Sequence, residues 1–309
     1  MRQFATTLRR MQRLNNFGTI SFTGADVRNF LQGQLSNDLQ LLTPQQSLLN
    51  SCNSAQGRVQ VVLTLIERSD AIVAVLPASM IDTTMARLRK YILRSKVVIT
   101  ATHNTLHCNA ATAHDLQSAT LPIPTTLGAH LQQHASSILR WPDANAERYM
   151  VLQTTIETNT AATDDDHQWL LADIRAGLPQ VLPPTHEAFV AQMLNLDLIS
   201  GISFNKGCYT GQEIIARAHF RGAVKRRLFR MRAACPPPAP ATRILLQADQ
   251  ATHAGDVVMA AATDNGCELL AVLSLNQQGA PLCLETHPMN LLEQLSLPYE
   301  PVGAAILQN

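Results

Sequence analysis

The sequence predicts an α+β protein of two or three domains, and three observations support that prediction. Residues 47–99 have the pattern strand, strand, helix, strand, which is typical of a small α+β unit. The proline-rich stretch "ACPPPAPATR" at 234–243 fits neither a helix nor a central strand and indicates a stiff connector. The short apolar segments after it predict a small terminal β-barrel or sandwich.

The N-terminal segment "FGTISFTGADVRNFLQGQLSNDL" predicts a strand, a turn and a helix in that order. Ile20 and Phe22 lie on one face of the strand, and Gly24 belongs to the turn. The apolar residues from Val27 to Leu35 then recur at helical spacing.

Within residues 47–99, "SLLNSCN" and "RVQVVLTLIE" predict two strands joined by the turn "SAQG". The tripeptide "RSD" reverses the chain into "AIVAVLP", so the second and third strands are expected to form a hairpin. "ASMIDTTMARLRKYIL" then follows helical spacing, and "KVVIT" returns as a strand.

In the middle of the chain, "TLGAHLQQHASSIL" at 126–139 predicts a helix and "RYMVLQTT" a strand. "TNTAATDDDH" predicts a polar loop, and "LPQVLPPTHE" at 178–187 ends a unit. After the proline-rich connector, "RILLQA", "AGDVVMAAAT" and "CELLAVLSL" predict strands.

The composition describes a chain with an ordinary core and little net charge. Apolar residues make up 46% of the 309 residues, charged residues 15%, and the net charge is +1. A globally basic nucleic-acid-binding protein is therefore not expected. Charges interrupt the N-terminal stretch, so it does not resemble a signal peptide. No apolar run is long enough for a membrane span. The six cysteines form no CxxC pair. We expect a cytoplasmic protein with reduced thiols.

The stretch "KGCYTGQE" at 206–213 places a cysteine between two glycines and ahead of a basic segment. One interpretation is a reactive thiol at Cys208, activated by Lys206 and lying beside an anion-binding wall. The other is a tight turn with a packed cysteine, followed by a strand with a solvated basic face. The residues alone leave both open.

Trp169 has two interpretations as well, because a tryptophan packs in a core or stacks on a planar heterocycle. The ten histidines include no HExxH pair, so no metal site is expected. No GxGxxG loop, Walker sequence or nucleophile elbow occurs, which argues against the usual nucleotide-binding folds and hydrolases.

The stretch "GISFNKGCYTGQEIIARAHFRGAVKRRL" resembles the YgfZ-type folate-binding proteins, relatives of the aminomethyltransferase (T-protein) of the glycine cleavage system. Further similarity lies in "SFTGADVRNFLQGQLSND", "CNSAQGRVQVVLTL", "RLRKYILRSKVVI", "QWLLADIRAGLP" and "LPYE", so it covers nearly the whole chain.

The resemblance implies a clover-leaf of three domains, with two α/β folate-binding domains and a C-terminal β-barrel. The expected first domain is discontinuous, with residues 1–46 and 102–205, and the α+β domain 47–101 is inserted into it. Residues 206–233 are the signature segment and connector, and 234–309 the barrel.

The resemblance also implies a binding site for tetrahydrofolate or another reduced folate. Cys208 would be the candidate catalytic residue, a reactive thiol acting in redox or cluster-linked chemistry. Phe17, which stands where relatives usually have Trp, and Trp169 are the aromatic positions associated with folate. The other expected cofactor-binding residues lie in or after the signature: Lys206, Tyr209, Gln212, Glu213, Arg217, Arg221 and Arg227.

Two departures from the relatives bear on activity. Val61 stands at the position of the catalytic aspartate of the T-protein, and valine transfers no proton. Aminomethyl transfer by that route is therefore not expected. Arg175 stands where many relatives have glutamate, next to the expected folate pocket.

Three functions follow. The first is a folate-binding protein that supports iron–sulfur cluster enzymes, with tRNA-thiolating radical enzymes as partners and thereby a role in tRNA modification. The second is an aminomethyltransferase in which Asp38 replaces the missing aspartate. The third is an RNA-binding scaffold that uses the basic residues of 217–232, although direct nucleic-acid binding is not the favoured reading.

Overall fold

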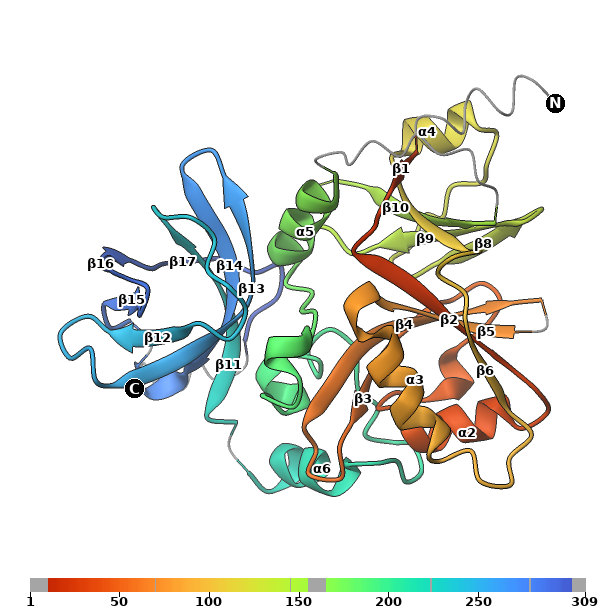
Figure 1. Ribbon diagram of the computed structural model, residues 1–309, viewed down its shortest axis with the longest axis horizontal. Helices are drawn as coiled ribbons and strands as arrows, with labels where there is room; N and C mark the ends of the chain where they lie inside the picture. The colour runs from red at the N-terminus through yellow and green to blue at the C-terminus, as the bar shows by residue number, and fades with distance from the viewer. Residues whose placement is uncertain are drawn as a thin grey trace.

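The computed structural model describes residues 11–69, 71–144, 146–154, 165–222, 224–277 and 279–301. It is a mixed α and β structure with three antiparallel sheets, shown in Figure 1. The N-terminal stretch 1–10 and most of the predicted polar loop "TNTAATDDDH" lie outside the described residues, and the end of that loop sequence belongs to a helix. No helix in the described ranges is long and apolar enough to cross a membrane.

The central sheet has the strand order β3-β4-β5-β2-β6. Its strands are β2 (Phe17–Thr23), β3 (Leu48–Asn53), β4 (Val59–Arg68), β5 (Ala71–Pro77) and β6 (Val98–Ala101). The helices beside it are α2 (Val27–Gln34) and α3 (Ile81–Arg89), with the short turns η2 (Leu39–Leu41) and η3 (Ala78–Met80). The predicted strands, hairpin and first helix of this region are confirmed, but the second helix ends at Arg89.

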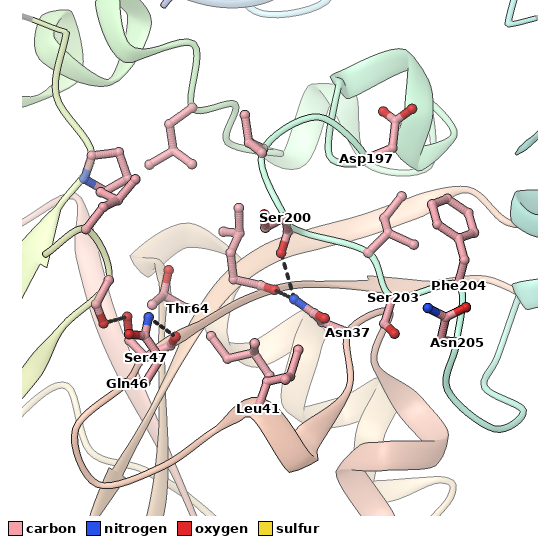
Figure 2. A pocket seen from close by; sticks show the side chains of 18 of the residues that line it. Asn37, Leu41, Gln46, Ser47, Thr64, Asp197, Ser200, Ser203, Phe204 and Asn205 are labelled. Carbon is pink, nitrogen blue, oxygen red and sulfur yellow. Dashed lines mark hydrogen bonds between the residues drawn. The ribbon is translucent and has the colours of Figure 1, made fainter. Parts of the chain in front are cut away.

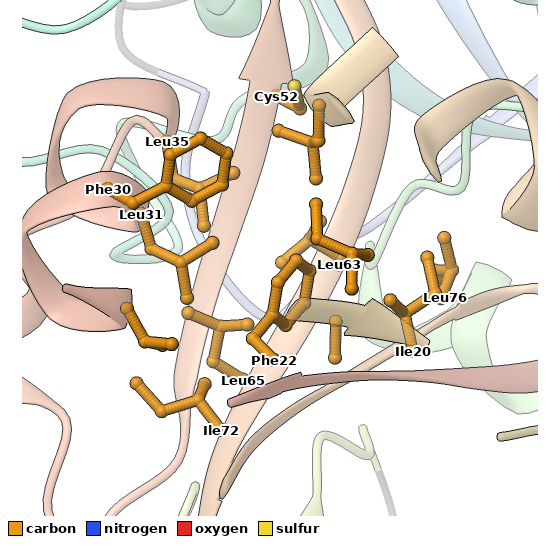
Figure 3. Packing of buried hydrophobic residues seen from close by; sticks show 14 of the residues in the cluster. Ile20, Phe22, Phe30, Leu31, Leu35, Cys52, Leu63, Leu65, Ile72 and Leu76 are labelled. Atoms are coloured by element: carbon orange, nitrogen blue, oxygen red, sulfur yellow. The ribbon is translucent and has the colours of Figure 1, made fainter. Parts of the chain in front are cut away.

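Both faces of the central sheet are buried, which explains its continuous apolar strands. Figure 3 shows the face covered by the helices, where Phe22, Leu63 and Leu65 pack against Phe30 and Leu31 of α2. On the opposite face, side chains of β4 and β5 pack against the second sheet.

This outer sheet has the order β1-β7-β10-β9-β8 and carries α4 on its far side. Its elements are β1 (Gln12–Arg13), β7 (His107–Ala111), α4 (Ala113–Ser118), β8 (His130–Gln133), β9 (Ser136–Trp141) and β10 (Arg148–Gln153). The predicted helix at 126–139 is wrong, because this segment forms the β8–β9 hairpin. Pairing of β9 with β10 supplies the tertiary contacts that outweigh a weak local pattern.

The C-terminal sheet is seven-stranded and curled, with the order β16-β15-β12-β13-β14-β11-β17. Its strands are β11 (Arg226–Ala233), β12 (Arg243–Leu246), β13 (His253–Thr263), β14 (Gly266–Ser274), β15 (Leu282–Leu284), β16 (His287–Leu291) and β17 (Glu293–Leu295), with η6 (Leu275–Gln277). In Figure 1, α5 (Asp165–Ala176) lies between this sheet and the other two. η4 (Pro183–Thr185), η5 (Ala191–Leu194) and α6 (Gln212–Phe220) connect them.

Two of the sheets join segments that lie far apart in the sequence. Strand β2 pairs with β5 and β6, so residues 17–23 share a sheet with strands from residues 48–101. Strand β11 pairs with β14, so the C-terminal sheet begins at Arg226, before the proline-rich connector. Strand pairing over long sequence separations carries no local signal, and the sequence gives no sign of either contact.

Candidate functional site

A cavity of about 820 Å³ opens where the central sheet, the outer sheet and the segment 197–220 meet. Figure 2 shows its polar lining by Asn37, Gln46, Ser47 and Thr64. The remaining lining includes apolar and aromatic side chains: Leu41, Leu127, Trp141, Phe204, His219 and Phe220. A cavity of this size with a mixed lining accommodates a drug-sized ligand.

Two charged side chains of the lining are already neutralised. Asp197 accepts two hydrogen bonds from Arg227, at 2.7 and 3.0 Å, and Arg140 forms an ion pair with Glu147. The third ionisable side chain, His219, stacks on Phe204 with ring centroids 3.8 Å apart. The lining therefore favours a planar ligand with hydrogen-bonding groups over a compact ion.

A much smaller cavity of about 20 Å³ adjoins the first, and Phe17 and Trp141 are among the residues that line it. The two cavities share Leu49, Thr64, Trp141 and Leu178 in their linings, so the Trp141 side chain lies between them. Phe17 lines the 20 Å³ cavity and does not line the 820 Å³ cavity.

Trp169 lies in the core behind this wall. Its side chain is buried, packs against Phe17 and Trp141, and has the Arg148 guanidinium 4.4 Å above its ring. The position matches the core-packing interpretation of this tryptophan. Trp169 supports the wall from behind, and Trp141 presents the aromatic side chain to the cavity.

The orientation of Trp141 depends on a buried polar network around Asp173. The fully buried carboxylate of Asp173 accepts hydrogen bonds from Trp141 Nε1 at 3.0 Å and Gln180 Nε2 at 2.7 Å, and pairs with Arg148. Burial raises the pKa of Asp173, and Arg148 and the two neutral donors oppose that rise. The network fixes the Trp141 ring at the cavity wall.

Lys206 fixes the end of α2 and the turn that follows it. Its Nζ donates to the backbone carbonyls of Gln32, Leu35 and Asn37 at 2.7 to 2.8 Å, at the C-terminal end of α2. Burial lowers its pKa to about 8, and Asp38 partly opposes this effect. All three ammonium protons are thereby used, so Lys206 fixes the turn that carries Asn37 into the cavity.

Cys208 is exposed, and the other five cysteines are buried. It is not part of the cavity lining. Of its neighbours, Tyr209 is buried with a pKa raised to about 12 by burial, Gln212 begins α6, and Glu213 is exposed.

The two glycines Gly57 and Gly211 explain how the signature meets the central sheet. Both have positive φ, of 70° and 83°, and an added Cβ on Gly211 would lie 3.0 Å from the Gly57 Cα. A side chain at either position would force the two turns apart. The contact brings the segment before α6 against the β3–β4 turn.

The basic stretch is largely ion-paired by acids that lie far away in sequence. Arg226 pairs with Asp256, Arg227 with Asp197, Arg230 with Glu268 and Arg232 with Glu293. Arg217, Arg221 and Lys225 are exposed and have no ion pair with a described acid. None of the predicted site residues is among the residues that line the 820 Å³ cavity.

Arg175 connects α5 to the C-terminal sheet. It forms a bidentate ion pair with Glu268, which also pairs with Arg230. Burial tends to raise the pKa of Glu268, but the hydrogen bonds and charges of these two arginines outweigh burial and lower the pKa from its ordinary value.

Arg175→Glu is therefore expected to lower the free energy of unfolding by about 2 kcal/mol at pH 7, because a second carboxylate would face Glu268. The stabilisation from Glu268 is complete above the ordinary carboxyl pKa and is lost as the pH falls through the lowered pKa. Urea unfolding at pH 7 and pH 3 measures both effects. Arg232→Glu, at an exposed pair, is the control, and equal losses in the two variants would contradict the prediction.

The two positions considered for proton transfer lie outside the cavity. Val61 packs into the core beneath α2 and α3, and its neighbour Val62 is buried on the opposite face, so neither supplies an acid. Asp38 caps η2 by accepting from the Gln40 backbone N–H. No group of three or more His, Cys, Asp and Glu side chains in the described ranges is arranged to hold a metal ion.

Sequence reasoning missed the residues that line the cavity. Phe204, Asn205, His219 and Phe220 lie within the matched stretch 201–228, and Asn37 lies within the matched stretch 21–38, so membership of these stretches was the available signal. Trp141 lies in none of the matched stretches, so it carried no such signal.

Comparison with known proteins shows which solved structure the fold resembles. No protein-family profile matches the chain. The crystal structure of glycine cleavage system aminomethyltransferase T from Bartonella henselae aligns with a TM-score of 0.64 and 15% sequence identity, over 93% of this chain and 85% of that chain. The likeness at this identity concerns the fold alone. The chain therefore has an aminomethyltransferase-like fold with a curled antiparallel C-terminal sheet.

Proposed function

We propose that the protein binds tetrahydrofolate or another reduced folate in the 820 Å³ cavity. The observation that carries the proposal is this cavity, with Trp141, Phe204 and Phe220 beside polar side chains, in an aminomethyltransferase-like fold. A pterin and a benzoyl ring are planar and hydrogen-bond at their edges, which suits stacking on aromatic side chains beside amides and hydroxyls. Phe17, Trp169, Lys206 and Arg227 then act as supports of the cavity walls.

The same proposal extends to a role in supporting iron–sulfur cluster enzymes and tRNA modification, with Cys208 as the exposed thiol. Aminomethyl transfer is the less favoured candidate, because the side chains of Val61 and Val62 have no ionisable group for proton transfer and Asp197 forms an ion pair with Arg227. RNA binding by the basic stretch is less favoured too, since four of its seven cations are ion-paired.

Titration of tetrahydrofolate against the full chain tests the binding site. Phe220→Ala is expected to weaken binding about fivefold through loss of a stacking contact worth about 1 kcal/mol. Ser203→Trp is expected to abolish binding because it fills the cavity. Leu93→Ala, at a side chain 88% exposed on the α3 side of the central sheet, is the control. Unchanged affinity in both cavity variants would exclude this site.

The cellular role is tested separately in a deletion strain carrying the wild type or Cys208→Ser. The expected result is that the serine variant fails to restore iron–sulfur enzyme activity and tRNA thiolation while folate binding is unchanged. Full rescue would assign Cys208 no chemical role.

A further inference from the structure

A third cavity, of about 370 Å³, lies on the helix side of the central sheet. It is lined by Cys52, Gln60, Val61, Thr83, Thr84, Ala86, Arg87, Lys90 and His186. These residues come from β3, β4, α3 and the segment after η4, and none of them lines the larger cavity. Strand β4 contributes to both cavities but with different side chains.

Arg87 is fixed at this cavity by neutral acceptors. Its Nε donates to Gln60 Oε1 at 2.6 Å, its Nη1 to Gln34 Oε1 at 2.8 Å and its Nη2 to the Asn53 carbonyl at 2.9 Å. Tyr91 lies against its guanidinium plane at 4.6 Å. Three of its five N–H donors are used, and it forms no ion pair with an acid in the described ranges, so a positioned charge remains without a counter-ion.

Further donors lie on the same side of α3. Thr83, Arg87 and Lys90 are spaced four and three residues apart, which places them on one face of the helix. Thr84 is only 4% exposed, and its Oγ1 has no hydrogen-bond partner among the described residues. A buried hydroxyl without a partner in a cavity lining is costly unless a ligand or water satisfies it.

The lining of this cavity contains Arg87 and Lys90 but no Asp or Glu, so its charge is positive. Glu187 contacts the site only indirectly, by accepting from Gln60 Nε2 at 2.6 Å, and does not line the cavity. Burial raises the pKa of Cys52 to about 11, with a smaller opposing effect of Arg87, so the thiol is uncharged at neutral pH. His186 adds a further nitrogen to the lining.

We propose that this third cavity, of about 370 Å³, binds the phosphate group of a small phosphate ester. A phosphate presents several acceptor oxygens and up to two negative charges, which match the free N–H donors of Arg87, the ammonium of Lys90 and the hydroxyls of Thr83 and Thr84. The volume leaves room for the organic part of the ester beside the phosphate. No bond is made or broken at this site.

Isothermal titration calorimetry on the full chain at low salt, with ribose 5-phosphate and inorganic phosphate as separate probes, tests the proposal. The ester is expected to bind more tightly than inorganic phosphate. Lys90→Ala is expected to weaken ester binding about tenfold, and Thr84→Val is expected to weaken it severalfold. Arg87→Met is expected to abolish binding, but it also removes three internal hydrogen bonds, so the two milder variants decide the matter.

Arg94→Ala is the matched control, because it removes one exposed positive charge outside the cavity. Equal weakening by Arg94→Ala and Lys90→Ala would show general charge attraction and overturn the site. Tighter binding of inorganic phosphate than of the ester would overturn the ester assignment. Tetrahydrofolate is expected not to compete, so failure here is distinguishable from failure of the proposed function.

Discussion

Arg148→Met is expected to lower the free energy of unfolding by about 3–5 kcal/mol, which is the largest effect among the variants considered. Arg148 is the cation that pairs with the fully buried Asp173. Without it, the carboxylate retains only the neutral donors Trp141 Nε1 and Gln180 Nε2. Chemical denaturation followed by tryptophan fluorescence measures the loss, since Trp141 and Trp169 both contact the network.

The pH dependence of this variant provides a second readout. In the variant, the pKa of the unpaired Asp173 rises further above its unfolded value, so the folded state binds a proton that the unfolded chain does not. Stability of the variant relative to wild type is therefore expected to improve as the pH falls from 7 to 5. The double variant Arg148→Met/Asp173→Leu is expected to recover much of the loss, because an apolar pair carries no buried charge.

Arg232→Met is the control for Arg148→Met. Its ion pair with Glu293 has both side chains more than half exposed, at 58% and 59%, and its loss is expected to cost less than about 1 kcal/mol. A similar cost for the two arginines, or no recovery in the double variant, would contradict the account of the Asp173 network.

Lys206→Met is expected to lower the free energy of unfolding by about 3 kcal/mol, because it leaves three carbonyls at the end of α2 without their donor. Since the turn that follows carries Asn37 into the 820 Å³ cavity, folate affinity is expected to fall as well. Urea unfolding and folate titration on the same sample measure the two effects.

Lys225→Met is the matched control, at an exposed lysine with no described ion pair. It is expected to leave both quantities within error of the wild type. If Lys206→Met retained full stability and lost only folate affinity, Lys206 would contact the ligand directly and the structural role assigned to it would be wrong.

The local elements of the central sheet could be predicted from the sequence, and the hairpin formed by β8 and β9 could not. Residues 48–77 contain nearly continuous apolar and β-branched runs bounded by turn residues, so the local pattern and the tertiary contacts agree. The segment 126–139 has a mixed pattern, and its state depends on pairing between β9 and β10. Helix α6 was not predicted, because it begins after Gly211, whose left-handed backbone conformation replaces the usual side-chain N-cap.

The sequence by itself determined the α+β class, the turn chemistry of "KGCYTGQE" and the likeness to an aminomethyltransferase-like fold. Only the tertiary structure decided which charges are free, because Arg227, Arg230 and Arg175 meet acids on other elements. It also decided that Lys206 supports a helix end and that Trp141, not Trp169, lines the large cavity. The physical reason is that side-chain partners and cavities arise from contacts between distant segments, which local spacing does not encode.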